Sequence, residues 1–273
     1  MLSLPPVTGR TDVILAQLSW PEIEGARSCV CVVPLGSLEQ HGPHLPLWTD
    51  TAIVSEIARR VEQQLPEQVL LAPAQPIGYS PHHARFGCVT LDVPAYMALI
   101  GGVCRSFAAM GLGRILLLNG HGGNDAPCRA AMCALKTEMP GLRIVLASYW
   151  TLAAEAFSRI RTSPRGGMGH ACEMETSIML ALHPDQVKLE RAKDDGTAGE
   201  SGYRLLDMLH PQPYYVVRDF DEISASGTVG QPSCASGEKG KQFLNAAVEA
   251  VCSLAAAFAA GELDFDERTG HEI

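Results

Sequence analysis

Short hydrophobic runs alternate with longer segments of helical periodicity along the first half of the chain. The runs are rich in β-branched residues and leucine, which is typical of buried strands. They cover Val30–Leu35 and residues 69–72, 114–118 and 143–147. Helices are predicted at residues 51–64, 96–110, 126–138, 176–182 and 240–260. Strands that alternate with helices in this way predict an α/β fold around a mostly parallel sheet.

The second half of the chain carries fewer regular elements. Residues 192–240 are rich in Gly, Ser, Asp and Pro, so loops are expected there. The sequence contains no internal repeat, low-complexity tract or clear linker. We therefore predict a single domain over residues 1–273.

Composition and charge narrow the class of protein. Of the 273 residues, 47% are hydrophobic and 19% charged, which excludes a disordered chain. The net charge of -9 argues against nucleic acid as a partner, because binding phosphates needs a surplus of Lys and Arg. Nine cysteines without a C-x-x-C pair fit reduced thiols in a cytoplasmic protein. The N-terminus lacks a signal-peptide pattern, and the most apolar stretch, residues 246–260, is shorter than the roughly 20 residues of a membrane span.

The densest group of chemically active side chains follows the first predicted strand. In extended backbone, residues two apart point the same way, so Glu39 and His41 are expected to converge while Gln40 faces away. Asp50 lies at an expected helix N-cap, which brings its carboxylate back to the end of the strand. The alternative is that Asp50 only caps its helix and that His41 and His44 are ordinary loop residues.

A second group follows the strand at residues 114–118. A glycine-rich turn, NGHGGND at residues 119–125, places His121 in the crevice beyond the carboxyl end of the sheet, where ligands bind in such folds. The turn does not match the dinucleotide motif G-x-G-x-x-G, and GKQ at residues 240–242 lacks the features of a P-loop. A nucleotide site is therefore disfavoured.

The third group lies at and just before the start of the helix predicted at residues 176–182. Glu175 shares a helical stripe with Ile178, Met179 and Leu182, so its side chain should point into the core. Glu173 is about 200° away around the helix and is the weaker candidate. For both carboxylates the alternative is a capping role at the helix start.

Taken together, these groups supply a set of nitrogen and oxygen ligands without thiolate: Glu39, His41, Asp50, His121 and Glu175. Five such ligands suffice for two divalent cations if Asp50 bridges them. Zn, Mn or Fe suit the set better than Ca or Mg, which favour all-oxygen shells. The sequence thus predicts two divalent metal ions per chain and a hydrolase that activates a water between them.

The sequence resembles the creatininase, or creatinine amidohydrolase, family at these residues. The resemblance rests on EQHGPHLP at residues 39–46 with Asp50, on NGHGGN at residues 119–124, and on His170 five residues before Glu175. Weaker similarities are GYSPHH at residues 78–83 and GEKG at residues 237–240. The family implies a three-layer α/β/α fold, a dinuclear metal centre, hydrolysis of C–N bonds in cyclic or linear amides, and a homohexamer.

The sequence departs from the creatinine-hydrolysing members in two places. Those members carry a metal-binding Glu two residues after the turn histidine, where this chain has Gly123, so Glu175 is expected to complete the second site with Glu173 as alternative. The aromatic residues that enclose creatinine are also missing before His170. We therefore expect a small-molecule amide substrate other than creatinine. Family members with the same turn include deformylases, a peptidase-like maturation enzyme and hydrolases of cyclic ketones, and the sequence does not choose among them.

Proton transfer to the leaving nitrogen needs a further residue. His170 precedes the helix that carries Glu175, and an imidazole at the edge of the centre can take up and release protons near neutral pH. His83 is the reserve candidate. The alternatives are that His170 is a metal ligand or a residue of the helix start. The absence of the turn Glu is also compatible with a different class of function. The protein would then be a catalytically inactive small-molecule binding or regulatory protein on the same fold.

Overall fold

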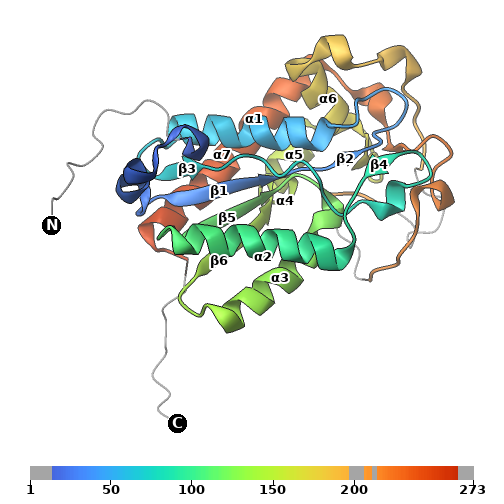
Figure 1. Ribbon diagram of the computed structural model, residues 1–273. Coiled ribbons are helices and arrows are strands. Elements are labelled where there is room, and N and C mark those ends of the chain that lie inside the picture. Colours follow the sequence, from blue (N-terminus) through green and yellow to red (C-terminus); the bar gives the residue numbers. More distant parts are fainter. Residues whose placement is uncertain (1–13, 197–205, 211–213, 264–273) are drawn as a thin grey trace, which may run out of the picture.

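A four-stranded parallel sheet forms the centre of the protein, as Figure 1 shows. The computed structural model describes residues 14–196, 206–210 and 214–263. The strands run in the spatial order β3-β1-β5-β6 and correspond to the four predicted hydrophobic runs. They are β1 (Val30–Leu35), β3 (Val69–Leu71), β5 (Arg114–Asn119) and β6 (Arg143–Ser148). The predicted parallel sheet is confirmed.

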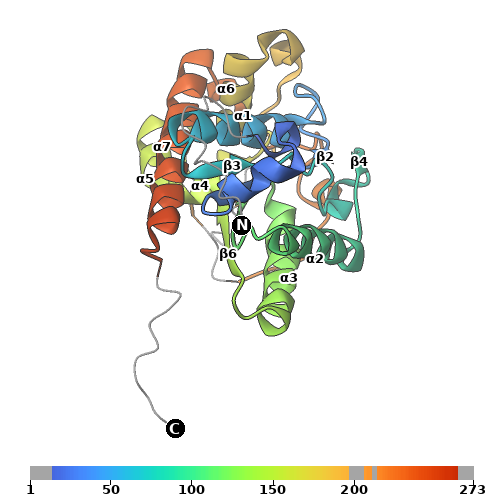
Figure 2. The same ribbon diagram turned by 60° about the vertical axis from the view of Figure 1, so that its left-hand side comes forward.

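Helices cover both faces of this sheet, which gives the three layers that the family resemblance implies (Figures 1 and 2). One face carries α1 (Thr49–Gln64), α4 (Tyr149–Leu152), α5 (Ala154–Ile160), α6 (Glu173–Leu182) and α7 (Gly237–Ala260). The other face carries α2 (Val93–Ala109) and α3 (Asp125–Glu138). The α/β fold class is confirmed.

The two halves of the core reflect the alternation of side chains along each strand. Val30 and Val32 of β1 pack with α1, α6 and α7, whereas Cys31 and Val33 pack with α2 and α3. Leu116 and Ile115 of β5 divide between the two faces in the same way. Both faces are buried, which is why these strands appear in the sequence as continuous hydrophobic runs.

Two short antiparallel pairs lie beside the main sheet and were not predicted. β2 (Leu38–Glu39) pairs with β4 (Cys88–Val89), and β7 (Met168–His170) pairs with β8 (Val229–Gly230). Strands of two or three residues carry no periodicity that a sequence can reveal. Both pairs nevertheless hold candidate site residues, Glu39 and His170. The described parts of residues 192–240 are mostly loop, as expected, and residues 197–205 and 211–213 lie outside the description.

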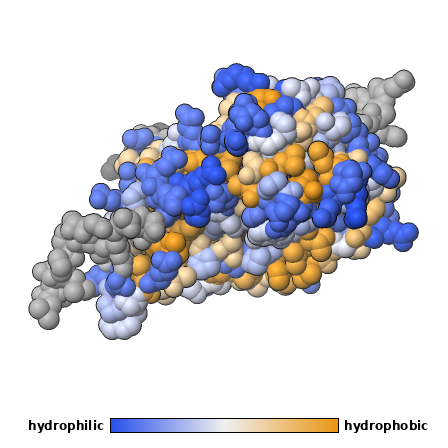
Figure 3. Space-filling model, turned by 90° about the horizontal axis from the view of Figure 1, so that it is seen from above, coloured by the Kyte–Doolittle hydropathy of each residue, from blue (hydrophilic) through white to orange (hydrophobic). Residues whose placement is uncertain are grey.

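Helix α7 is longer than the predicted one and is apolar enough in length and composition to span a membrane. Core helices of globular proteins pass the same test. Here Phe243, Leu244, Ala247 and Val251 are buried against the first half of the core, so α7 has the packing of a core helix. Seen from the side of α1 and α6, the surface mixes hydrophilic and hydrophobic residues (Figure 3).

Candidate metal centre

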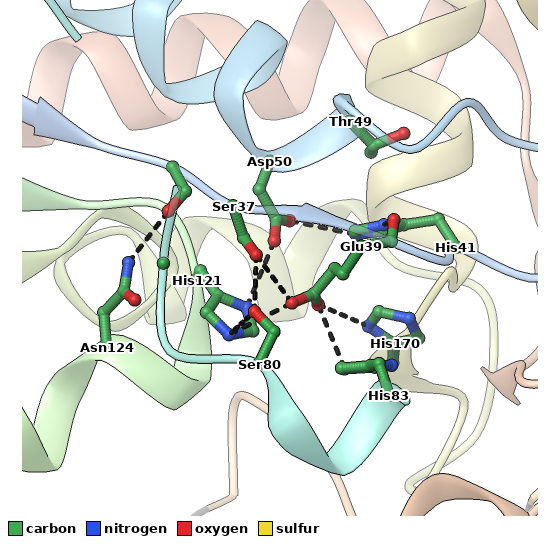
Figure 4. Close-up of polar contacts among 12 residues, drawn as sticks. Ser37, Glu39, His41, Thr49, Asp50, Ser80, His83, His121, Asn124 and His170 are labelled. Atoms are coloured by element: carbon green, nitrogen blue, oxygen red, sulfur yellow. Dashed lines mark hydrogen bonds and ion pairs between the residues drawn. The ribbon is translucent and has the colours of Figure 1, made fainter. Parts of the chain in front are cut away.

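Three of the candidate ligands are brought together where β1 and β5 end and α1 begins, the edge at which parallel α/β sheets bind ligands. Figure 4 shows Glu39, Asp50 and His121 facing one another. His121 Nδ1 lies 3.1 Å from Asp50 Oδ2, and His121 Nε2 lies 3.2 Å from Glu39 Oε2. All three side chains are buried. Their ligand atoms lie within 4.8 Å of one another and could hold a metal ion.

A second group joins the first through Asp50. His41 Nε2 lies 2.9 Å from Asp50 Oδ1 and 4.0 Å from Glu175 Oε1. The ligand atoms of His41, His170 and Glu175 again lie within 4.8 Å of one another. The two oxygens of Asp50 therefore face two different histidines, one in each group.

The local structure around Asp50 differs from the prediction. Helix α1 begins at Thr49 with Trp48 as its N-cap, so Asp50 is the second helical residue and does not cap the helix. Its carboxylate still lies at the positive end of the helix dipole, which favours the charged form. The strand-end position of the side chain was predicted correctly, and the capping alternative is excluded.

The two carboxylates of α6 have different partners. Cys172 N–H donates to Glu175 Oε2 at 3.2 Å, so one oxygen of Glu175 caps α6 while the other faces His41. Glu173 accepts hydrogen bonds from the main-chain N–H groups of Thr162 and Ser163 and pairs with Lys239 at 2.6 Å. Glu173 is thereby occupied away from the centre, and Glu175 is the carboxylate that reaches it.

The expected orientation of Gln40 is wrong. Its side-chain nitrogen lies 2.8 Å from His83 Nδ1 and 3.2 Å from His170 Nε2, so Gln40 faces the site. Strand β2 ends at Glu39 and Gly42 takes a positive φ of 62°, which bends the chain. The alternation of side chains holds only inside a strand, and Gln40 lies beyond it.

The two candidate proton carriers lie side by side next to Glu39. His83 Nε2 is 3.0 Å and His170 Nδ1 is 3.9 Å from Glu39 Oε1, and both rings are buried. Phe220, from a short 3-10 helix in the late loop, stacks on His83 with ring centroids 3.9 Å apart and lies edge-on to His170. Phe220 was missed by the sequence reasoning, since no local motif links it to the site.

The buried carboxylates of the centre shift the pKa values of the groups beside them in the direction that favours positive charge. Burial tends to lower the pKa of His41, but Asp50 and Glu175 raise it to about 10. Burial likewise opposes the charge of His121, but Glu39 and Asp50 raise its pKa. Burial and Asp50 together raise the pKa of Glu175 to about 7, although His41 works against them. Among the described residues, every ion pair of these three carboxylates has a histidine as its partner.

The residues fit divalent cations. Glu39 Oε1 and Asp50 Oδ2 are buried and make no well-aligned hydrogen bond within the described structure. Their contacts are ion pairs with histidine, His83 Nε2 at 3.0 Å and His121 Nδ1 at 3.1 Å. Bare, buried carboxylate oxygens are costly unless a cation or donor satisfies them. The donor set of carboxylates and imidazoles without thiolate suits Zn, Mn or Fe.

Comparisons with known proteins agree with this geometry. The family Creatininase, described as creatinine amidohydrolase, matches residues 16–255. This chain belongs to the creatininase family. A mycofactocin precursor peptide peptidase of Mycobacterium tuberculosis (strain CDC 1551 / Oshkosh) is 34% identical over 227 residues, covering 80% of this chain and 81% of the relative. The creatinine amidohydrolase of Pseudomonas putida is 27% identical over 258 residues, covering 88% and 95%.

Solved creatininase structures share the fold. A mutant creatininase of Zn-Zn type superposes with a TM-score of 0.75 at 27% identity, covering 90% of this chain and 97% of the other. A creatininase with Mn gives a TM-score of 0.72 at 28% identity, covering 89% and 97%. The chain is thus an amidohydrolase of the creatininase family, with clustered residues able to bind metal.

Gly123, the position at which the resemblance to creatinine-hydrolysing members led us to expect a Glu, has no room for a side chain. A Cβ on Gly123 would lie 2.2 Å from the carbonyl oxygen of Tyr79 and 2.5 Å from His121 Nε2. The Tyr79 carbonyl and the rings of His121 and His82 therefore occupy the space that a Glu at this position would need.

Several residues that orient the ligands received no role from the sequence, although two of them, Ser80 and Asn124, lie in the motifs at residues 78–83 and 119–124. Ser37 Oγ donates to Glu39 Oε2 at 2.8 Å and lies 2.6 Å from Ser80 Oγ, which in turn is 3.2 Å from His121 Nε2 (Figure 4). Asn124 accepts from Tyr79 N–H and donates to the Gly36 carbonyl, so it joins the loops on both sides of the centre. Serine and asparagine are too common in loops for a sequence to single them out.

Proposed function

We propose that this protein hydrolyses the C–N bond of a small cyclic or linear amide at a centre of two divalent cations. The observation that carries the proposal is the position of Asp50, whose two oxygens face His121 and His41 in separate ligand groups. A carboxylate in this arrangement is suited to bridge two metal ions.

The ligand groups divide between the two cations. Glu39, Asp50 and His121 would hold one ion, and His41, Asp50 and Glu175 the other. Zn, Mn or Fe bound there would polarise the amide carbonyl and lower the pKa of a water molecule. Ser37 keeps the Glu39 carboxylate in place through its hydrogen bond, so the chain supplies a preorganised ligand set.

His170 is the residue that moves the proton. Its ring is 8% exposed and its Nδ1 faces Glu39, at the edge of the centre. The burial of His170 and the neighbouring His41 lower its pKa well below the usual range, so the resting ring is neutral. His170 would take the proton that the attacking water releases and pass it to the leaving nitrogen. Phe220 packs edge-on against the ring and shields it from water on that side.

The substrate class follows from what the site lacks. The space beside Gly123 is filled by the Tyr79 carbonyl, so the site differs from one with a turn Glu, and we do not expect creatinine to be the substrate. Lactams, formamides and short peptides are the amides to test, the last because one relative is a peptide peptidase. Release of amine or carboxylate from one of these classes by protein loaded with Zn or Mn would support the proposal. Cleavage of none by protein that holds two ions would favour an inactive binding protein instead.

A paired substrate test separates proton transfer from metal binding. With His170→Ala, hydrolysis of an ordinary amide should fall by roughly 10²–10⁴-fold, while an activated amide whose leaving group needs no proton is largely spared. His183→Ala, a histidine outside the centre that packs on Trp48, serves as the matched control and should change neither rate. Equal losses on both substrates, or loss of metal, would show that His170 does not transfer the proton.

A homo-oligomer, by family resemblance a hexamer, remains part of the proposal. The described residues expose several large hydrophobic side chains, among them Trp20, Tyr215 and Val217 at more than 80% exposure. Exposed apolar groups of this size often mark contact surfaces between subunits. Light scattering at micromolar concentration should give a mass several times that of one chain, and a monomer would contradict this point.

A further inference from the structure

Gln40 lies between His83 and His170, and two contacts fix which end of its amide is nitrogen. Its Oε1 accepts a hydrogen bond from Gly42 N–H at 2.8 Å, and its Nε2 donates to the carbonyl oxygen of Gly227 at 3.0 Å. Exchanging the two atoms would set donor against donor and acceptor against acceptor. The amide nitrogen therefore faces the two histidines.

The second N–H of Gln40 determines the proton position on His83. Nε2 of Gln40 lies 2.8 Å from His83 Nδ1, so this ring nitrogen has to accept. In the neutral ring the proton is then on His83 Nε2, the nitrogen that lies 3.0 Å from Glu39 Oε1. His83 thus presents an N–H to the carboxylate.

His170 is oriented the opposite way. Its Nε2 lies 2.7 Å from the main-chain carbonyl oxygen of Gln40, which can only accept, so the proton of the neutral ring is on Nε2. Its Nδ1 is left bare and lies 3.9 Å from Glu39 Oε1. The 3.2 Å approach between His170 Nε2 and Gln40 Nε2 is then a contact between two donors.

We propose that Gln40 is a positioning residue that fixes both histidines in the Nε2–H tautomer, so that His83 offers N–H to Glu39 and His170 offers a bare Nδ1 to the centre. Neither ring nitrogen of His83 is then available to accept a proton, because Nδ1 accepts from Gln40 and Nε2–H faces Glu39 Oε1. His170 is the proton acceptor of the pair. The tautomers follow from hydrogen bonds alone, whereas the acceptor role rests on the proposed hydrolase function.

Nitrogen NMR of protein labelled with ¹⁵N-histidine and loaded with Zn tests the tautomers directly. Protonated and bare ring nitrogens differ widely in chemical shift, and His83→Gln and His170→Gln identify the two sets of signals. We expect a proton on Nε2 of both rings. A proton on Nδ1 of either ring in the unsubstituted protein would overturn the proposal, without need of any Gln40 variant.

Substitution of Gln40 tests its role. Gln40→Glu replaces the donor that faces His83 Nδ1 by an acceptor, so the His83 proton should move to Nδ1, while His170, held by the main chain, keeps its tautomer. Gln40→Met removes the hydrogen bond without adding charge and should lower turnover by about 10–100-fold with both cations retained. Gln63→Glu, the same exchange at an exposed position of α1, is the matched control and should leave the spectra unchanged.

The outcomes separate the two proposals. An unchanged His83 tautomer in a folded Gln40→Glu protein, or full turnover in Gln40→Met, would overturn the positioning role. The expected tautomers in a protein that cleaves no amide would refute the hydrolase function while supporting the role of Gln40 in orienting the rings.

Discussion

Replacement of Lys239 by methionine should destabilise the protein by about 3 kcal/mol. Lys239 Nζ pairs with Glu173 Oε1 at 2.6 Å, and the Glu173 side chain is fully buried, so the variant leaves a buried carboxylate without its cation. Breaking a buried ion pair from one side costs about 3–5 kcal/mol. We expect the lower end of this energy range, because Glu173 keeps hydrogen bonds from Thr162 and Ser163 and the Lys239 side chain is 19% exposed.

The loss should depend on pH in a defined direction. Burial tends to raise the pKa of Glu173, but Lys239 and the N–H donors lower it below the usual carboxyl value of 4.5. A lowered carboxyl pKa stabilises the folded state above the unfolded value and ceases to do so as pH falls through the folded value. The difference between the two proteins should therefore be full at pH 7 and shrink below about pH 4.5.

Urea unfolding of both proteins at pH 7 measures the effect, with the midpoint shifted and the slope unchanged. Lys241→Met on the same helix is the matched control, because Lys241 pairs with Glu238 at 3.6 Å on the exposed surface. Its effect should stay within about 0.5 kcal/mol. If Lys239→Met changed the free energy of unfolding no more than Lys241→Met does, the buried Glu173–Lys239 pair would not contribute the expected stability.

The remaining predictions concern the metal centre. Glu175→Gln should lower the zinc content from about two ions per chain to about one, while Glu173→Gln keeps both, and the reverse pattern would move the ligand role to Glu173. Zinc affinity should rise with pH, because the raised pKa of His41 means that a bound cation displaces a proton from its ring. Calorimetry of zinc binding in buffers of different ionisation heat should detect the released proton. Binding heats that do not depend on the buffer would contradict this prediction. Gly123→Glu should lower the melting temperature and leave creatinine uncleaved, because the new Cβ meets the Tyr79 carbonyl; gain of creatinine hydrolysis would refute this.

The main sheet and its helices could be predicted because burial on both faces leaves a strong pattern. The four strands are continuous hydrophobic runs, and α1 and α3 show helical periodicity beside them. The short pairs β2/β4 and β7/β8 could not be predicted, since their pairing is decided by tertiary contacts rather than by local sequence. Proline at N1 or N2 and Asp92 as N-cap explain why α2 starts earlier than its periodicity indicates.

The candidate ligands could be placed because they follow predicted strands or begin predicted helices. His121 after β5 and Asp50 at the start of α1 are examples. Gln40 was misplaced because strand alternation was extended past the end of β2. Phe220 reaches His83 from a distant loop, which no local pattern reveals. The hexamer and the cytoplasmic location stay predictions.

Anomalous diffraction from zinc-loaded crystals tests the two-cation centre most directly, because it locates each ion among the side chains. We expect two anomalous peaks in each chain, one among Glu39, Asp50 and His121 and one among His41, Asp50 and Glu175. A single peak, or peaks that do not share Asp50, would contradict the proposed two-cation hydrolase.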